Sequence, residues 1–136
     1  MNREQIVQFL NAHPMCHLAT MDGDQPRVRG MMMYRAESAG ILFHTGVFKS
    51  LYGQITRNRR VEICFNDERT QVRVEGIARI LDDISLKREI VAARPFMKPL
   101  IEERGYGVLV VFRVVDWKFT VWTMDTNLEP TVYSRL

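Results

Sequence analysis

The sequence predicts a mainly β domain (α+β) in which an antiparallel sheet closes into a barrel and helices flank it. About seven segments show the short apolar runs or the alternation typical of strands. Most of these segments are joined by tight turns, so neighbouring strands should run antiparallel. Gly76 stands in the middle of an alternating segment. A glycine there is typical of a bulge or of a sharp barrel corner, which favours a closed barrel over an open sheet.

Length and composition limit the class of protein. The 136 residues predict a single domain, residues 1–136, that is large enough for a hydrophobic core. A 46% apolar and 26% charged composition is ordinary for a globular protein, and a net charge of +3 is only a weak indication of an anionic ligand. The first twenty residues lack a basic stretch followed by an apolar run, and the longest apolar run, Val108–Phe112, is too short to cross a membrane. We therefore expect a cytoplasmic protein that does not contact a membrane.

The first third of the chain reads as one helix and a β-meander. Asn2 can cap a helix, and Gln5 three residues later completes a capping box; the helix should end before Pro14. Asp22-Gly23 is a strong hairpin signal between the first two strands that follow. The three strands expected here are Met15–Thr20, Arg27–Tyr34 and Ile41–His44.

The stretch from Ile41 to Ile55 predicts a strand that passes directly into a helix. The strand should break at Thr45-Gly46, after which Phe48, Leu51, Tyr52 and Ile55 have helical spacing. A helix start leaves backbone N–H groups without partners, and with the Thr45 hydroxyl and Lys49 these groups would form a phosphate or carboxylate site. The alternative is a plain strand–turn–helix with one solvated lysine.

The second half predicts further strands separated by a helical segment. Asp82 or Asp83 should cap the first helix, and Pro95 should separate it from a second helical piece that reaches Arg104. No pattern is visible from Asp125 onwards. The elements expected here are the strands Val61–Asn66, Gln71–Leu81, Val108–Val115 and Trp117–Thr123 and the helix Ser85–Arg94.

Basic residues suggest one candidate site and argue against another. Arg27 and Arg29 share a face of their strand, either because that face is solvated or because one of them meets the same anion as Lys49. Arginine suits phosphate because its planar fork donates two hydrogen bonds at once. The cluster Arg57–Arg60 is better explained as a solvated helix end than as a nucleic-acid face.

The remaining constellations do not indicate side-chain catalysis. Three methionines, Met31–Met33, would pack in the core or line an adaptable pocket. His13, His17 and His44 lack cysteine or carboxylate companions, so we expect no metal site. No phosphate-binding loop, dinucleotide fingerprint or nucleophile elbow is present. If the protein is an enzyme, its reactive centre should be a cofactor.

Three stretches resemble the pyridoxamine 5′-phosphate oxidase-like, FMN-binding split-barrel family. They are Q-P-R-V-R-G-M-M-M-Y, which looks like the family's Pro-x-x-Arg strand, F-H-T-G-V-F-K, which looks like its phosphate turn, and T-Q-V-R-V-E-G-I-A-R, which looks like its second cofactor strand. The spacing from Lys49 to Val61 is closer to the nitroimidazole-resistance and general-stress-protein branch. The resemblance covers Met15 to Leu81 well and the C-terminal strands loosely.

The resemblance implies a six-stranded antiparallel split barrel and a homodimer with FMN at the interface, acting on a small-molecule substrate. By position, Arg29 and Lys49 would hold the phosphate, and Thr45 would add a hydroxyl or backbone bond. The backbone from Gly30 to Met33 would run beside the flavin ring, Gln71 would bond its pyrimidine end, and Trp122 would approach from the partner subunit. The predicted cofactor-binding residues are Arg29, Gly30, Met31, Met32, Met33, His44, Thr45, Lys49, Gln71 and Trp122; no catalytic residue is assigned.

Departures from the family pattern disfavour pyridoxamine phosphate oxidation itself. Phe48 stands where the family oxidases have a basic residue beside the phosphate lysine, and Tyr34 replaces a lysine. No counterpart of the oxidase's C-terminal substrate-binding arginine and histidine follows Trp122. The favoured function is an FMN-dependent oxidoreductase with an unidentified substrate. A non-catalytic flavin-binding stress protein or carrier, and a split barrel that binds haem (through His44 or His17) or a deazaflavin, remain alternatives.

Overall fold

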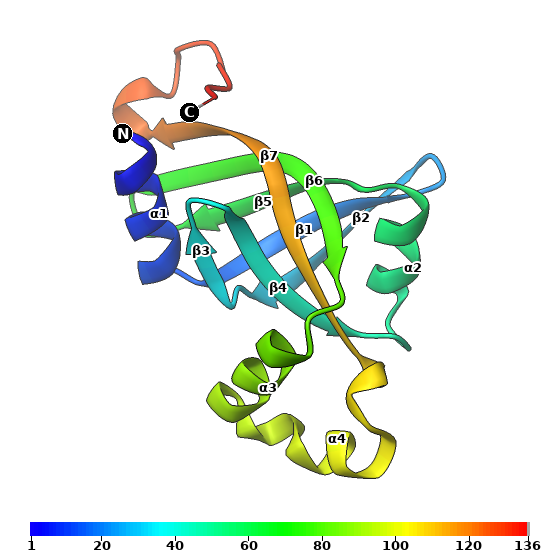
Figure 1. The fold of residues 1–136 in the computed structure, drawn as a ribbon. Coiled ribbons are helices and arrows are strands. Elements are labelled where there is room, and N and C mark those ends of the chain that lie inside the picture. Colours follow the sequence, from blue (N-terminus) through cyan, green and yellow to red (C-terminus); the bar gives the residue numbers. More distant parts are fainter. Residues whose placement is uncertain (136) are drawn as a thin grey trace.

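The computed structural model describes residues 1–135 and contains one seven-stranded antiparallel sheet, in the order β2-β1-β5-β6-β7-β4-β3, with helices on its flanks (Figure 1). The edge strands β2 and β3 share no ladder within the described residues, so the barrel is split there. The strands are β1 (Met15–Asp22), β2 (Gln25–Met32), β3 (Arg35–Glu37), β4 (Gly40–Gly46), β5 (Arg60–Asn66), β6 (Thr70–Leu81) and β7 (Leu109–Thr123). The α-helices are α1 (Arg3–Ala12), α2 (Ser50–Arg57), α3 (Ile84–Ala93) and α4 (Lys98–Arg104), and the 3₁₀ turns are η1 (Pro95–Met97), η2 (Tyr106–Val108) and η3 (Met124–Thr126).

This architecture confirms the predicted mainly β fold class and the antiparallel split barrel. It has one strand more than the six that the family resemblance implies, because the three-residue β3 pairs with β4 as an additional edge. The predicted capping box is also present: the backbone N–H of Gln5 donates to Asn2 Oδ1 (2.9 Å), and the N–H of Asn2 donates to Gln5 Oε1 (2.8 Å).

The core fills the barrel with large apolar side chains. Phe43, Phe65 and Phe112 are fully buried, and the rings of Phe43 and Phe112 stack with centroids 5.4 Å apart. The expected bulge at Gly76 is present, since the register of β6 against β7 shifts between Glu75 and Ile77. A Cβ at residue 76 would lie 2.6 Å from Val114 Cγ1, so close packing at this corner requires glycine.

Two expected element boundaries are wrong for physical reasons. The strand Ile41–His44 does not break at Thr45-Gly46, because the ladder to β7 continues through Gly46↔Leu109; α2 consequently starts at Ser50, and Phe48 lies before the helix. The last two strands form one continuous β7, because Asp116 adopts a φ of 51° and absorbs the irregularity without ending the strand.

The segment from α3 to η2 forms a small second layer at one end of the barrel, drawn at the bottom of Figure 1. It has its own buried cluster, in which Ile90, Val91 and Ile101 pack against Leu42 and Val111 of the sheet. This packing holds the helices in place over the ends of β4 and β7. None of the helices within residues 1–135 is long and apolar enough to cross a membrane.

Candidate functional site

A pocket of about 560 Å³ lies where β2, the end of β4, the start of α2 and the segment around η1 and α4 meet; we call it the cationic pocket. Its volume is within the range of small-molecule and cofactor sites. Its lining residues are Arg29, Gly30, Met31, Met32, His44, Thr45, Gly46, Phe48, Lys49, Ser50, Leu51, Arg94, Phe96, Met97, Leu100, Ile101, Val108 and Leu109.

Three cations line this pocket without a carboxylate among them: Arg29, Lys49 and Arg94. Within residues 1–135, none of the three forms an ion pair with an aspartate or glutamate. Burial lowers the pKa of both Arg29 and Arg94, which shows that each guanidinium is partly removed from water. An anionic ligand would therefore stabilise these partly desolvated charges.

Arg29 is held by neutral groups. Its Nη1 donates to Thr20 Oγ1 (2.8 Å) and to the carbonyl oxygen of Leu18 (3.3 Å), and its Nη2 donates to Gln54 Oε1 (2.5 Å). Arg27, two residues earlier on β2, is instead exposed and pairs with Asp22 at 3.3 Å. The strand pattern alone left open which of the two arginines would meet an anion, whereas the family resemblance pointed to Arg29; in the structure it is Arg29 that lines the pocket.

The start of α2 forms the adjacent wall. Lys49 is the N-cap residue, no side chain caps the helix, and the first N–H groups of a helix lack intrahelical partners. The backbone therefore has the predicted turn with unpartnered N–H groups beside Lys49, but this turn lies four residues later in the sequence than expected. Phe48 is exposed at this end, and its ring packs on Gly46, where a Cβ would lie 2.8 Å from Phe48 Cζ.

Arg94 and His44 meet in the wall of the cationic pocket. Arg94 Nη1 lies 2.7 Å from His44 Nε2, and its other bonds go to the carbonyl oxygens of Met32 (3.2 Å) and Met33 (2.8 Å). Arginine can only donate, so Nε2 accepts and the ring proton resides on Nδ1. Burial, and then the charge of Arg94, lower the pKa of His44 to about 4, so the imidazole is neutral at pH 7.

Sequence reasoning missed Arg94. Pro95 was interpreted only as a helix breaker, and no local pattern connects residue 94 to a strand 62 positions earlier, where its side chain binds the Met32 carbonyl. The same holds for Phe96, Met97 and Leu100, which line the pocket only because the α3–α4 segment folds over β4.

Seven of the predicted cofactor-binding residues come together in this pocket: Arg29, Gly30, Met31, Met32, His44, Thr45 and Lys49. Met33 lies behind them, with a 1% exposed side chain, and contributes its carbonyl to Arg94. Gln71 and Trp122 are not in the pocket. They pair across β6 and β7 and line a separate hollow under residues 126–131, where Trp122 Nε1 donates to Asn127 Oδ1 (3.0 Å).

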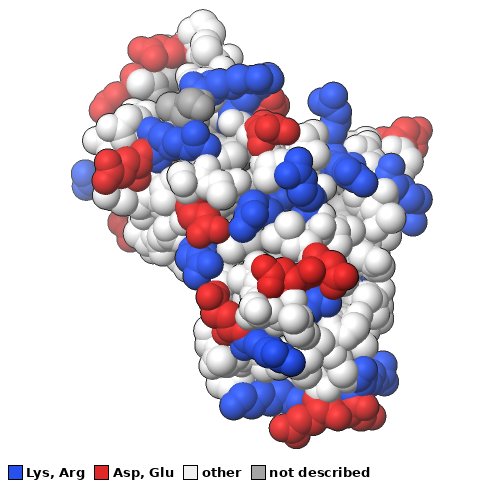
Figure 2. Space-filling model, viewed as in Figure 1, with Lys and Arg blue, Asp and Glu red and all other residues white. Residues whose placement is uncertain are grey.

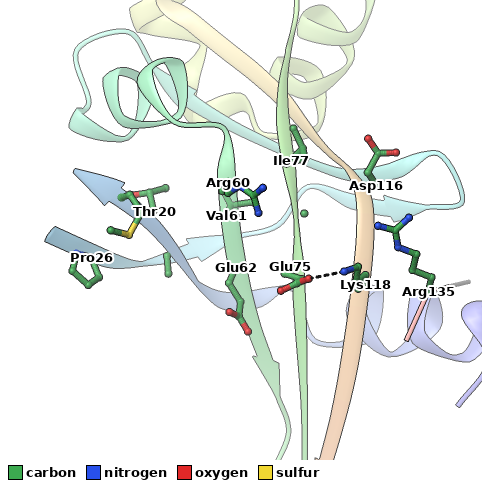
Figure 3. A pocket seen from close by; sticks show the side chains of 13 residues that line it. Thr20, Pro26, Arg60, Val61, Glu62, Glu75, Ile77, Asp116, Lys118 and Arg135 are labelled. Atoms are coloured by element: carbon green, nitrogen blue, oxygen red, sulfur yellow. Dashed lines mark ion pairs between the residues drawn. The ribbon is translucent and has the colours of Figure 1, made fainter. Parts of the chain in front are cut away.

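A further hollow, of about 440 Å³, lies over β1, β5, β6 and β7 and is shown in Figure 3; we call it the mixed-charge hollow. Its cations Arg60, Lys118 and Arg135 are accompanied by the carboxylates Glu62, Glu75 and Asp116. Glu75 and Lys118 pair at 3.5 Å. On the face of the molecule shown in Figure 2, basic and acidic side chains are likewise interleaved, so that face has no broad basic surface for a nucleic acid.

Comparisons with known proteins match the chain to one family model and to several solved structures. The family model described as pyridoxamine 5′-phosphate oxidase matches residues 3–120. Among solved structures, the chain is similar to a NimC/NimA family protein from Clostridium acetobutylicum (TM-score 0.78, 22% identity, 98% of this chain and 92% of that one). It is also similar to general stress protein 26 from Bacillus anthracis (TM-score 0.69, 21% identity, 98% and 97%) and to an FAD-binding protein from Mesorhizobium loti (TM-score 0.63, 16% identity, 90% and 96%). No curated protein sequence matches the chain.

Proposed function

The chain belongs to the pyridoxamine 5′-phosphate oxidase family, and from this premise we propose that it is a flavin-binding protein that holds FMN in the cationic pocket and acts as an FMN-dependent oxidoreductase on a small molecule. The observation that carries the proposal is the set of three partly buried or pocket-facing cations that no carboxylate compensates. FMN supplies the missing charge, because its phosphate is a dianion near neutral pH.

The residues of the pocket fit the two halves of FMN. Arg29, Lys49 and the free N–H groups at the start of α2 would hold the phosphate, since a fork of guanidinium donors and a helix N-terminus both favour that group. Met31, Met32, Met97 and Leu100 provide apolar surface for the ring system. The FAD-binding relative supports a flavin in this fold. We propose FMN because the pocket offers cations for one terminal phosphate.

A flavin would supply hydride transfer, and the protein would supply position and exclusion of water. His44 is fixed by Arg94 as a neutral imidazole whose Nδ1–H is its only donor, so it can donate one hydrogen bond but does not carry a charge at pH 7. Arg94 is itself anchored by two backbone carbonyls, that of Met32 at the end of β2 and that of Met33 just after it. Together they form a hydrogen-bonded polar part of the pocket wall, and Phe96 and Leu100 add apolar surface that would limit access of water.

We further propose a homodimer in which the partner subunit completes the site. Gln71 and Trp122 lie outside the cationic pocket of their own chain, so they can contribute to a flavin site only across an interface. Exposed apolar side chains follow Trp122 in the sequence: Met124 is 73% and Leu128 is 96% exposed. Such a cluster is typical of a surface that another chain covers.

A haem alternative is less compatible with the site. The Nε2 atom of His44 already accepts from Arg94, and His17 is exposed on β1 and does not line the cationic pocket. A deazaflavin would meet the same walls as FMN. A flavin carrier without turnover would need the same phosphate contacts as an enzyme.

The absorption spectrum of the protein as purified, or after addition of FMN, tests the proposal. We expect flavin bands, release of FMN on denaturation, and a dimer by light scattering. A Soret band or a deazaflavin spectrum would identify the other cofactors, and a colourless protein that does not bind added FMN would refute the proposal. Bound FMN that is not reduced by NADH or NADPH, and no turnover with quinone or nitro acceptors, would identify a carrier.

A further inference from the structure

The guanidinium of Arg29 belongs to a closed ring of hydrogen bonds with two buried neutral side chains. Thr20 is 2% and Gln54 is 4% exposed. Arg29 donates to both of their oxygens, and Thr20 Oγ1 also donates to Gln54 Oε1 at 2.6 Å. Both buried oxygens therefore have hydrogen-bond partners, and the charge of Arg29 meets only neutral acceptors, so the buried polar network is satisfied without a carboxylate.

Counting donors shows which edge of Arg29 remains available. A guanidinium has five N–H groups. Two on Nη1 go to Thr20 and Leu18, and one on Nη2 goes to Gln54. Within residues 1–135, the second Nη2–H and the Nε–H form no hydrogen bond. These two donors lie side by side on one edge, in the fork that matches two oxygens of a phosphate or carboxylate.

We infer that Gln54 and Thr20 are positioning residues that fix Arg29 with its side-on fork available to the ligand's anionic group, and that the neutral amide at residue 54 determines how strongly the pocket prefers a phosphorylated flavin to riboflavin. The inference rests on the proposed function, since the anionic group is the flavin phosphate.

The chemistry of residue 54 explains why an amide is needed. Gln54 Oε1 accepts a hydrogen bond from Arg29 without adding a negative charge. A glutamate there would accept the same bond, but it would also form an ion pair with Arg29 and cancel the charge that the ligand needs. Gln54 also lies on α2, whose N-cap is Lys49, so the same helix positions both phosphate-binding cations.

The test compares dissociation constants for FMN and riboflavin, measured by quenching of flavin fluorescence. For Gln54→Glu we expect FMN binding to weaken about tenfold or more, as loss of a charged hydrogen bond implies, with riboflavin binding unchanged within about twofold. Gln8→Glu adds the same charge on the exposed side of α1 and should leave the ratio of the riboflavin to the FMN dissociation constant unchanged. Thr20→Ser keeps the hydroxyl and should preserve the ratio, whereas Thr20→Val should lower it.

A double-mutant cycle separates positioning from a general structural effect. In the Arg29→Met background, Gln54→Glu should no longer change the ratio, because the group that it neutralises is absent. If the Gln54→Glu and Thr20→Val single variants still bind FMN and their ratio is unchanged, this inference is overturned while the proposed function stands. If Gln54→Glu does not fold, as judged by thermal denaturation, Thr20→Val decides. If the unsubstituted protein binds neither flavin, the proposed function fails and this inference fails with it.

Discussion

The cationic pocket and the mixed-charge hollow each contain three cationic side chains, yet they differ in how that charge is compensated. In the mixed-charge hollow, Arg60, Lys118 and Arg135 share the surface with three carboxylates. In the cationic pocket, Arg29 and Arg94 are fixed by neutral oxygens and by a neutral imidazole, and Lys49 has no acidic neighbour in the lining. The comparison indicates that neutral acceptors leave the positive charge available to a ligand, whereas carboxylates neutralise it.

The largest expected effect comes from removing the fixed cation. Arg29→Met should weaken FMN binding by about 2–3 kcal/mol, since a charged, partly buried hydrogen-bond donor is lost. Titration of the purified protein with FMN measures the change. Arg27→Met is the matched control, because Arg27 lies on the same strand but is exposed and pairs with Asp22. Equal loss of affinity in the two variants would contradict the assignment of the phosphate to Arg29.

The second prediction concerns the neutral His44. Its folded pKa of about 4 lies below the ordinary value of 6.5, so the unfolded state binds more protons between these two values. The free energy of unfolding should therefore have its full value above about pH 6.5. As the pH decreases towards 4, it should fall by up to about 1.4 kcal/mol per pH unit.

Chemical denaturation at pH 7 and at pH 5.5 measures this loss. His44→Gln should reduce the difference between the two pH values, because glutamine does not titrate. Acidic residues titrate mainly below this window, so the comparison of the two proteins isolates the imidazole. The same pH dependence in both would show that Arg94 and burial do not hold His44 neutral.

A site residue could be predicted from the sequence when the pattern that determines its position lies within a few neighbouring residues. Lys49 was predicted from its local turn pattern, whereas the strand pattern left Arg27 and Arg29 open and only the family resemblance selected Arg29; both predicted residues line the pocket. The capping box at Asn2 and the bulge at Gly76 were predictable for the same reason, since three or four adjacent residues determine them. Arg94 was not predictable, because its partners come from β2 and β4 and meet it only after α3 has packed on the sheet.

The errors in element boundaries have a related origin. Helical spacing of Phe48, Leu51, Tyr52 and Ile55 suggested an earlier helix start, but pairing with β7 extends β4 to Gly46 and delays α2. Tertiary pairing thus overrode a local pattern. Phe48 is left exposed at the pocket instead of forming part of the buried side of the helix.

The third prediction uses the more exposed cation of the pocket. Lys49→Ala should weaken FMN binding by about 1 kcal/mol, less than Arg29→Met, because an exposed ammonium group is more strongly screened by water and salt. The loss of FMN affinity caused by Lys49→Ala should shrink as the salt concentration rises. Lys98→Ala removes an exposed lysine that does not line the pocket and should not change affinity. A larger loss of FMN affinity in Lys49→Ala than in Arg29→Met would contradict the order that the burial of the two side chains implies.

The smallest effect is expected in the mixed-charge hollow. Glu75 and Lys118 pair at 3.5 Å, but their side chains are 42% and 35% exposed, so Glu75→Gln should lower the free energy of unfolding by only about 0.5 kcal/mol. Denaturant unfolding of this variant, of Lys118→Met and of the double variant measures the pair directly. FMN affinity should be the same in all three, since neither residue lines the cationic pocket. If Glu75→Gln changed FMN affinity as much as Lys49→Ala does, the compensated charges of this hollow would also act on the ligand, and the distinction between the two regions would fail.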